Sequence, residues 1–258
     1  MTSLKYHEKI LKEEIFFLND KWPHFDILFK GIKKIAKLSK KNQKKILFLE
    51  RTNLYGGISL FAPYFKKKNF LSIDCITDKL LKRGAYNKKF LINNKLIKIK
   101  SKYQYHYTKL KIKKNFFDFV VVPNLLHHIA DYEILFKQIK SFLKPRGYIF
   151  IFEPLVRELH QVPEDYTRFT PFGLSEILKK YGFKNEKIEF TGGPFSCMAY
   201  YLDQGMQYIP TKERINLQKR FNFEYKKLIL LDKKYKKNLV RKNTSSPMAF
   251  TILSKLHA

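Results

Sequence analysis

The sequence predicts an α/β protein with a Rossmann-like, doubly wound and mostly parallel sheet. Phe119 to Val122 is an unbroken apolar run, which suits a strand that is covered on both faces. A stretch with one apolar helical stripe follows, and Tyr148 to Phe152 is the next apolar strand. A strand, a crossover helix and a strand form a right-handed parallel unit, and the ligands of such sheets collect at the carboxyl ends of the strands.

Two apolar stretches before this unit predict two further strands. Ile46 to Leu49 ends in Glu50, and Phe70 to Ile73 ends in Asp74, 24 positions after Glu50. A helix is expected between these strands. Residues 1–44 carry two apolar stripes with helical spacing, so they predict a helical extension. This extension either forms a lid or packs over an edge of the sheet.

Capping and turn residues mark the ends of the later elements. Asp131 is expected to cap the helix of the crossover unit. Lys144 to Gly147 has proline in the second place and glycine in the fourth, as a type I turn favours. Thr170 is expected to cap another helix, which begins at Pro171 and closes at Gly182.

The last part of the chain has a different pattern. In residues 194–246, apolar residues lie three to four positions apart or at multiples of that spacing, so one or two inserted helices are expected. Residues 247–258 predict a final strand, antiparallel beside the fifth or sixth strand. With residues 45–193 as the core, residues 1–258 are expected to form a single domain.

The charge of the chain gives weak support to a nucleic-acid partner. The net charge is +30, but eight of the 52 basic residues are arginine. Surfaces that bind nucleic acid usually depend on arginine for bidentate contacts, whereas these lysines are spread along nearly every segment. A nucleic-acid partner is therefore possible but not favoured, and the oligomeric state cannot be read from the sequence.

Composition also predicts the compartment. Two cysteines are too few for a disulfide scaffold or a zinc site, so we expect a reducing compartment and no metal. No secretory signal is visible, and no apolar run approaches the roughly 20 residues of a membrane span. These features predict a cytoplasmic protein without a membrane span.

The two acids that end the first strands suggest a nucleoside site. A strand, a turn containing Gly56 and Gly57, a helix and a second strand closed by an acid form the arrangement that binds nucleosides. In this arrangement Asp74 is expected to accept hydrogen bonds from the ribose hydroxyls.

With these motifs, the chain resembles the class I S-adenosylmethionine-dependent methyltransferases, close to the broad bacterial type 11 group. The resemblance covers roughly residues 44–193 and is most specific from Phe117 to His128, followed by 143–147 and 152–154. Residues 160–174 resemble a stretch that covers the acceptor side of the site in many bacterial members. The resemblance implies a Rossmann-like enzyme whose cofactor is S-adenosylmethionine.

The resemblance also implies which residues bind the cofactor. These are Glu50, Thr52, Gly56, Gly57, Asp74, His106, Tyr107, Asn124 and Leu125. The family has glycine two, four and six places after the first acid, whereas this chain has Thr52, Leu54 and Gly56, so the turn is either reshaped or weaker in binding. Where the family has an acid at the adenine, this chain has His106, whose ring is expected to accept a hydrogen bond or, like that of Tyr107, to stack.

Histidines near the strand ends are the candidate catalytic residues, because a hydroxyl or amine acceptor must lose a proton. His128 is expected to face the cleft, while its neighbour His127 is expected to be structural. His160 is a second candidate, and Glu153 is either a base or an acid that holds the following loop. The candidate acceptor residues are Tyr166 and Arg168, although Arg168 could instead pair with Asp165 or Glu164 to fix that loop.

The preferred function is methyl transfer to a small-molecule, sugar or lipid-precursor acceptor. The stretch from Val122 to Leu125 differs from the motif of methyltransferases that act on amino groups of bases. The sequence also lacks the G-x-S-x-G, H-E-x-x-H and G-x-x-x-x-G-K-[ST] motifs. The alternative is a catalytically degenerate, methyltransferase-like binding protein with an anionic or nucleic-acid partner.

Overall fold

The computed structural model describes residues 25–50, 61, 64–76, 88–92, 95–99, 104–160, 162–240 and 246–257. Its helices are α2 (Phe25–Asn42), α4 (Tyr132–Phe142), α5 (Pro171–Lys180), α6 (Pro194–Gly205) and α7 (Thr211–Val240). Its strands are β1 (Ile46–Glu50), β2 (Phe70–Ile76), β3 (Lys88–Ile92), β4 (Lys95–Ile99), β5 (Gln104–His106), β6 (Phe117–Pro123), β7 (Leu143–Pro154), β8 (Phe183–Thr191) and β9 (Ala249–Leu256). Short 3₁₀ helices are η3 (Lys67–Asn69), η4 (Leu126–His128) and η5 (Met206–Tyr208).

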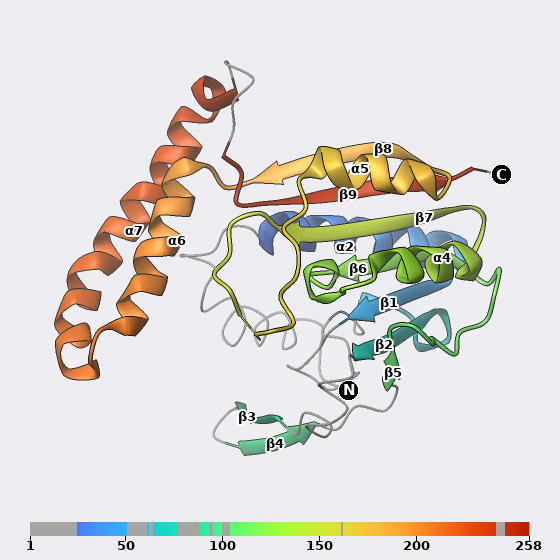
Figure 1. Cartoon of the computed structure of the whole chain (residues 1–258), viewed down its shortest axis with the longest axis horizontal. Coiled ribbons are helices and arrows are strands. Elements are labelled where there is room, and N and C mark those ends of the chain that lie inside the picture. Colours follow the sequence, from blue (N-terminus) through green and yellow to red (C-terminus); the bar gives the residue numbers. More distant parts are fainter. Residues whose placement is uncertain are drawn as a thin grey trace.

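Seven of the described strands form one sheet in the order β5-β2-β1-β6-β7-β9-β8, and β3 pairs with β4 in a separate antiparallel pair. The strands from β5 to β7 are parallel, and β9 is antiparallel to both of its neighbours. The parallel strands point toward the side of the molecule where α6 and α7 stand (Figure 1). The predicted sheet is confirmed, and its last strand, β9, lies between β7 and β8, which are the fifth and sixth of its seven strands along the chain.

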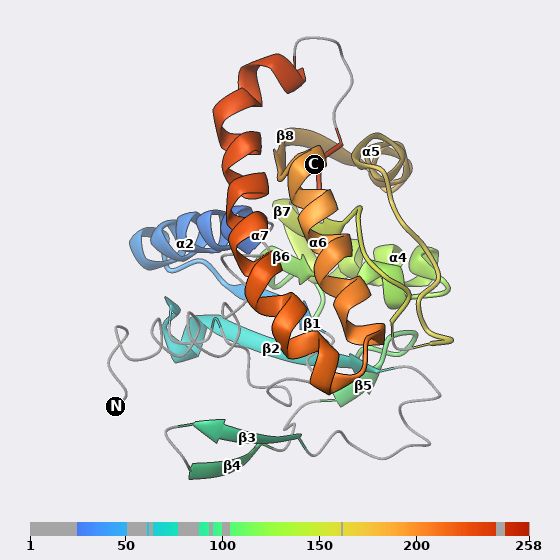
Figure 2. The same ribbon diagram turned by 90° about the vertical axis from the view of Figure 1, so that its left-hand side faces the viewer.

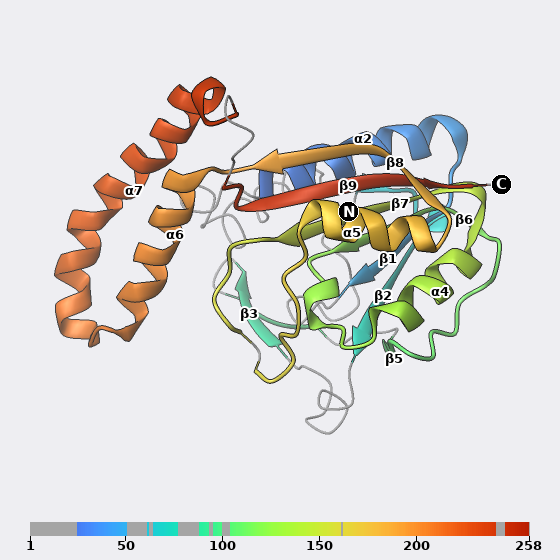
Figure 3. The same ribbon diagram turned by 45° about the horizontal axis from the view of Figure 1, so that its top comes forward.

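Helices cover both faces of the sheet. Figures 1 and 3 show α4 and α5 on one face and α2 on the other. The inner side of α2 buries Leu28, Ile32 and Ile35 against the sheet. A Cβ on Gly31 would lie 2.3 Å from the ring of Phe150, so this close approach of helix and sheet requires glycine.

Of the two expectations for the extension, α2 therefore follows the packing one, and it covers a face of the sheet rather than an edge. Leu38, which continues the helical spacing of the buried side of α2, is 39% exposed. The first predicted stripe of the extension lies outside the described residues.

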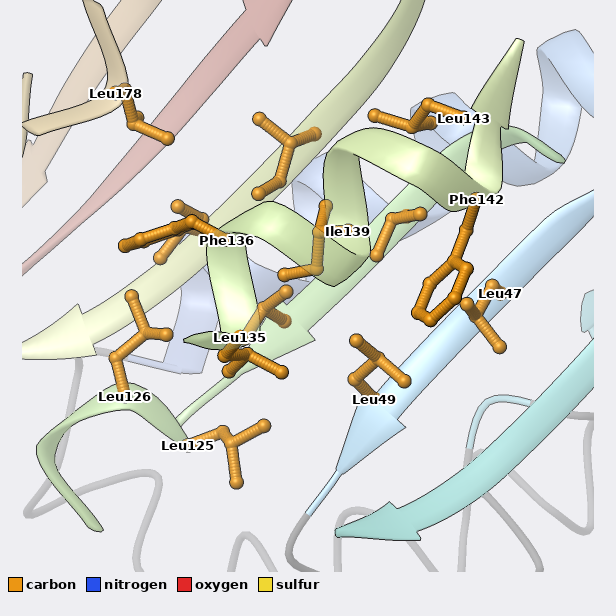
Figure 4. Packing of buried hydrophobic residues seen from close by; sticks show 14 of the residues in the cluster. Leu47, Leu49, Leu125, Leu126, Leu135, Phe136, Ile139, Phe142, Leu143 and Leu178 are labelled. Carbon is orange, nitrogen blue, oxygen red and sulfur yellow. The ribbon is translucent and has the colours of Figure 1, made fainter. Parts of the chain in front are cut away.

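The opposite face holds the larger core cluster. Figure 4 shows the buried side of α4 packed between β1 and the turn that follows β6. Leu125 and Leu126 of that turn are fully buried in this cluster. The residues labelled there are Leu47, Leu49, Leu125, Leu126, Leu135, Phe136, Ile139, Phe142, Leu143 and Leu178. The core therefore anchors the turn at the carboxyl end of β6.

The predicted helix caps are confirmed. The Asp131 side chain accepts a hydrogen bond from the Ile134 N–H, at 3.1 Å. Thr170 accepts one from the Gly173 N–H at 3.0 Å, and Pro171 begins α5. Gly182 follows that helix with φ 83°. Residue identity alone located these ends because the caps satisfy local backbone groups.

The predicted type I turn at Lys144 to Gly147 is wrong. Arg146, the third residue, has φ 62°, whereas the third position of a type I turn has a negative φ. The four residues lie within β7, where the pairing with β6 shifts register between Phe117 and Phe119. Proline at the second place favours type I and type II turns alike, so the sequence signal could not separate them.

The predicted insertion before the last strand consists of two helices, α6 and α7, which lie side by side (Figure 2). Tyr225 and Ile229 of α7 pack against Ala199 of α6. Tyr235, further along α7, is 39% exposed. Within the described residues, no helix combines the length and the hydropathy that crossing a membrane requires.

Candidate active site

The site lies at the carboxyl ends of β6 and β7, where the chain turns sharply after Pro123. Asn124 has φ 56°, a conformation that asparagine tolerates better than most residues. Its N–H donates to the Phe152 carbonyl at 2.7 Å. This turn directs the next residues, Leu125 to His128, across the end of β7.

Glu153 holds this turn with both of its carboxylate oxygens. Oε1 accepts hydrogen bonds from the N–H groups of Leu125 at 2.9 Å and Leu126 at 2.7 Å. Oε2 lies 2.6 Å from Nδ1 of His127. Glu153 and His127 are both fully buried. The engagement of both oxygens favours an orienting role for Glu153 over the role of a base.

Three imidazole rings meet beside Glu153, and we call His127, His128 and His160 the histidine cluster. Nε2 of His127 lies 3.4 Å from Nε2 of His160. One ligand-type nitrogen from each ring lies within 4.8 Å of the other two. His127 and His128 are buried, and the His160 side chain is 13% exposed. The two adjacent histidines thus both contribute to the cluster. The different roles predicted for them, a structural His127 and a cleft-facing His128, stay predictions.

The hydrogen-bond partners assign the tautomer of each ring. Nδ1 of His128 lies 2.6 Å from the Glu164 carbonyl oxygen. Nδ1 of His160 lies 3.1 Å from the Glu158 carbonyl and 3.0 Å from the Asp165 carboxylate. These groups, like the Glu153 carboxylate at His127, accept hydrogen bonds, so we assign the proton of each ring to Nδ1. In the neutral rings the lone pair is then on Nε2.

The surroundings keep His160 neutral. Burial, and after it the positive charge of Arg157, lower the pKa of His160 to about 4. The Asp165 carboxylate opposes this shift but does not reverse it. At neutral pH the ring therefore presents an imidazole nitrogen rather than a cation.

The loop between β7 and α5 covers the cluster, and we call residues 155–160 and 162–169 the strap. It is the yellow loop beside α6 in Figures 1 and 3. The Tyr200 hydroxyl of α6 donates a hydrogen bond to Glu158 of the strap. The Tyr166 N–H donates to the His127 carbonyl at 2.8 Å. Contacts to α6 and to the turn after β6 therefore hold the strap over the histidines.

Ion pairs within the strap fix its shape. Arg168 makes a bidentate contact with Asp165, in which Nη2 donates at 2.7 Å, and it also donates to the Glu158 carbonyl at 3.1 Å. Burial favours the neutral form of Asp165, but the hydrogen bonds from Arg168 and from the His160 N–H hold its pKa well below the usual value. The pairing of Arg168 with Asp165 is the arrangement expected if Arg168 fixes the loop. Tyr166, the other candidate acceptor residue, is 49% exposed.

The residues expected at the nucleoside lie on the neighbouring strands. Glu50 and Asp74 are direct neighbours in the register of β1 and β2, and they are 3% and 2% exposed. Burial, and after it the charges of Asp74 and Glu50, raise the pKa of the Cys75 thiol. We call the end of the sheet where the parallel strands finish the carboxyl edge. Its part at β1 and β2 is therefore a buried acidic site.

His106 and Tyr107 lie next to this acidic site. β5 pairs with β2, with His106 opposite Ile76, and the rings of His106 and Tyr107 have centroids 4.8 Å apart. Nδ1 of His106 accepts from the Thr108 N–H at 3.4 Å and lies 2.7 Å from the Thr108 hydroxyl. These contacts favour a ring proton on Nε2, and the expected role of His106, to accept a hydrogen bond or to stack on the adenine, stays a prediction. The expected cofactor residues Thr52, Gly56 and Gly57 lie outside the described residues.

A pocket of about 580 Å³ opens at the opposite end of the strands, where the parallel strands begin. We call this end of the sheet the amino edge. The lining of the pocket includes Asp118, Lys144 and Lys187 near the amino ends of the parallel strands. Ligands of parallel sheets bind at the carboxyl ends, so this pocket is not part of the candidate active site.

The sequence did not predict that three histidines would meet. The available signal was the His127-His128 pair after one buried strand and His160 after the next, 33 positions from His127. Because adjacent parallel strands end at the same edge, these segments come together. Neither paired cysteines nor the H-E-x-x-H spacing describes this set.

Comparison with known proteins identifies the family of the chain. The family model described as a methyltransferase domain matches residues 24–188. A structure of an S-adenosylmethionine-dependent methyltransferase from Archaeoglobus fulgidus is 16% identical, with 93% of this chain and 99% of that one covered, at a TM-score of 0.47. Phosphoethanolamine N-methyltransferase 2 of Haemonchus contortus is 18% identical, with 87% and 52% covered, at a TM-score of 0.44. No curated protein matches the chain in sequence. Since the family model spans more than half of the 258 residues, the chain belongs to the methyltransferase-domain family and is a class I S-adenosylmethionine-dependent methyltransferase.

Proposed function

We propose that this enzyme methylates a hydroxyl or amine of a small-molecule acceptor, a class that includes sugars and lipid precursors, bound under the strap. One observation carries the proposal. The acidic pair Glu50 and Asp74 and the histidine cluster lie at the same carboxyl edge, on strands that are neighbours in the sheet. A nucleoside site and a proton-accepting site are therefore side by side.

The acidic half of the edge fits the cofactor. Asp74 would accept hydrogen bonds from the ribose hydroxyls, and Glu50 would lie beside it. His106 would donate to the adenine, next to the ring of Tyr107, while Asn124 and Leu125 would flank the methionine part. When bound, S-adenosylmethionine supplies a methyl group that is already activated, so the protein's main task is to position the acceptor.

The histidine half of the edge fits the acceptor. His160 is the most exposed of the three rings, and it is neutral, so it would accept the proton that the acceptor loses. Glu153 would act through His127, whose orientation it holds. Tyr166 and Arg168 of the strap would contact the acceptor or hold the strap closed.

The strap favours a small acceptor over a nucleic acid. His127 and His128 lie beneath a loop that is bonded to α6 and to the turn after β6. A large substrate could place an atom against these rings only by displacing that loop.

Calorimetric titration with S-adenosylmethionine tests the cofactor half. We expect micromolar binding, which corresponds to about −8 kcal/mol, and a loss of at least tenfold in Asp74→Ala. Asp118→Asn, at the opposite edge, is the matched control and should bind as the wild type does. Equal binding by Asp74→Ala would show that the nucleoside lies elsewhere, and no binding by the wild type would favour the catalytically degenerate alternative.

Methyl transfer from isotope-labelled cofactor then tests the acceptor class. Pools of small hydroxyl and amine compounds are compared with RNA, DNA and denatured protein. We expect label in the small-molecule fraction, and less of it with His160→Gln. Label that enters only a macromolecule would overturn the proposal.

A further inference from the structure

We propose that the histidine cluster is a binding site for one divalent transition-metal ion of the class that prefers imidazole ligands, such as Zn²⁺ or Co²⁺. One nitrogen from each of His127, His128 and His160 lies within 4.8 Å of the other two. Neutral imidazole is a ligand for zinc, copper, iron and nickel, and three histidines with one open position is a known form of catalytic zinc site. The inference deepens the proposed function, since it concerns the acceptor half of the same site.

The distance between the two nearest nitrogens suits a shared ion. Ligands at about 2.0–2.1 Å from a tetrahedral zinc ion lie roughly 3.4 Å apart. The Nε2 atoms of His127 and His160 are 3.4 Å apart. The contributing nitrogen of His128 lies within 4.8 Å of the other two, so its ring would move inward to complete the set.

The tautomers of His127 and His160 present lone pairs to one another. Each Nδ1 donates to an acceptor of the chain, which leaves the lone pair of each neutral ring on Nε2. Two lone pairs that face one another repel unless a positive charge lies between them. A cation at this point turns the repulsion of His127 and His160 into two bonds.

The outer contacts of the rings are those of metal-binding histidines. Such histidines usually donate their second ring N–H to a carboxylate or a backbone carbonyl, which fixes the ring and strengthens the ligand. His127 donates to the Glu153 carboxylate, and His128 donates to the Glu164 carbonyl. His160 lies against both kinds of acceptor, the Asp165 carboxylate and the Glu158 carbonyl. All three rings meet this pattern.

The local charge also suits a divalent cation. Around the three rings, carboxylates outnumber guanidinium groups. The residues counted are those that contact a ring and those that contact such a residue in turn. The carboxylates are Glu153, Glu158, Glu164 and Asp165, and the guanidinium groups are Arg157 and Arg168. With neutral imidazoles and ionised carboxylates, these groups carry two net negative charges, which a divalent ion would balance.

A bound ion would change how the acceptor loses its proton. With the three rings as ligands, the fourth position would be open to an oxygen of water or of the acceptor. A metal ion lowers the pKa of a bound hydroxyl, so the acceptor hydroxyl would release its proton to water, and His160 would be a metal ligand instead of the proton acceptor. The ion would also orient the acceptor under the strap.

The test is titration of EDTA-treated protein with Co²⁺, followed by visible absorption, in the absence of cofactor and acceptor. We expect one equivalent to bind with the intense band of tetrahedral cobalt, and Zn²⁺ to displace it. His160→Gln should weaken binding at least 100-fold, and Glu153→Gln should weaken it 10- to 100-fold. His257→Gln, with an exposed histidine outside the cluster, is the matched control.

Circular dichroism and urea unfolding of the metal-free variants show whether each one is folded. If His160→Gln is folded and binds Co²⁺ as tightly as the wild type, the proposal is wrong. It is equally wrong if the wild type shows no cobalt band at one equivalent. Because cofactor binding is measured separately on Asp74→Ala, a failure here leaves the proposed methyl transfer standing.

Discussion

The two edges of the sheet hold carboxylates in different ways. At the amino edge, Asp118 accepts from the Lys45 N–H at 2.8 Å and pairs with the ammonium groups of Lys144 at 3.0 Å and Lys44 at 3.3 Å. The two lysine side chains that pair with it are 40% and 42% exposed. At the carboxyl edge, Glu153 is fully buried, and its partners are two backbone N–H groups and a buried imidazole.

This difference shows that the environment of the partner decides what a carboxylate contributes. An exposed ammonium group stays hydrated when its carboxylate is removed, so an exposed pair contributes little to stability. A buried N–H that loses its acceptor keeps the full cost of desolvation, about 1–3 kcal/mol for each group. The amino edge should therefore tolerate the loss of its acid, and the carboxyl edge should not.

Glu153→Gln should have the largest effect of the variants that test this comparison. The amide has one acceptor oxygen, so its NH₂ group must face either the His127 ring or the two backbone N–H groups. We expect a loss of about 3 kcal/mol in the free energy of unfolding, because a buried network is broken. Urea unfolding, followed by circular dichroism, measures it.

Asp118→Asn is the control for Glu153→Gln, with the same change from acid to amide at the other edge. We expect it to cost less than about 1 kcal/mol in unfolding free energy. Similar losses in the two variants would show that burial of the partners does not distinguish the edges.

Asp232→Ala should have an intermediate effect. The Asp232 carboxylate of α7 accepts from the N–H groups of Phe195 at 3.2 Å and Ser196 at 2.7 Å, so it caps the start of α6. We expect a loss of about 1–2 kcal/mol, as for other caps. Because α6 also carries Tyr200, which holds the strap, faster proteolysis of the strap should accompany the loss.

Gly193→Ala sharpens this prediction. A Cβ on Gly193 would lie 2.5 Å from Oδ1 of Asp232, so the substitution should disturb the same cap. In the Asp232→Ala background this clash is absent, and adding Gly193→Ala should cost much less than it does alone. Additive losses in the double-mutant cycle would contradict the proposed contact.

The sequence predicted the parts of the fold that local chemistry determines. The apolar runs located β1, β2, β6 and β7, and the caps at Asp131 and Thr170 marked two helices correctly. The exact type of the turn at Arg146 was not predictable, because proline at its second place favours type I and type II turns alike.

The site was predictable only in part, because contacts between distant segments build it. The strand ends pointed to Glu50, Asp74 and Glu153, since an acid after a buried strand lies at the ligand-binding edge. That Glu153 bonds to three groups of the turn after β6 depends on how the strands are placed side by side. The convergence of the histidines depends in addition on the path of the strap, for which the sequence has no periodic signal.

The pH dependence of Asp118 should be the smallest effect and the most specific test of the amino edge. Burial alone would raise the pKa of Asp118, but the Lys45 N–H and the two lysine ammonium groups outweigh it, so the pKa is lowered. The stability that results is fully present above the unfolded pKa of about 3.9, and it is lost as the pH falls through the lower pKa of the folded protein. The difference in unfolding free energy between wild type and Asp118→Asn should therefore be largest above about pH 5 and shrink toward pH 3, while staying below about 1 kcal/mol because both lysines are exposed.

High salt should reduce this difference as well, since exposed charges are screened. A difference that is independent of pH and salt would mean that the Lys45 N–H and the shape of the side chain, rather than the lysine charges, account for what Asp118 contributes.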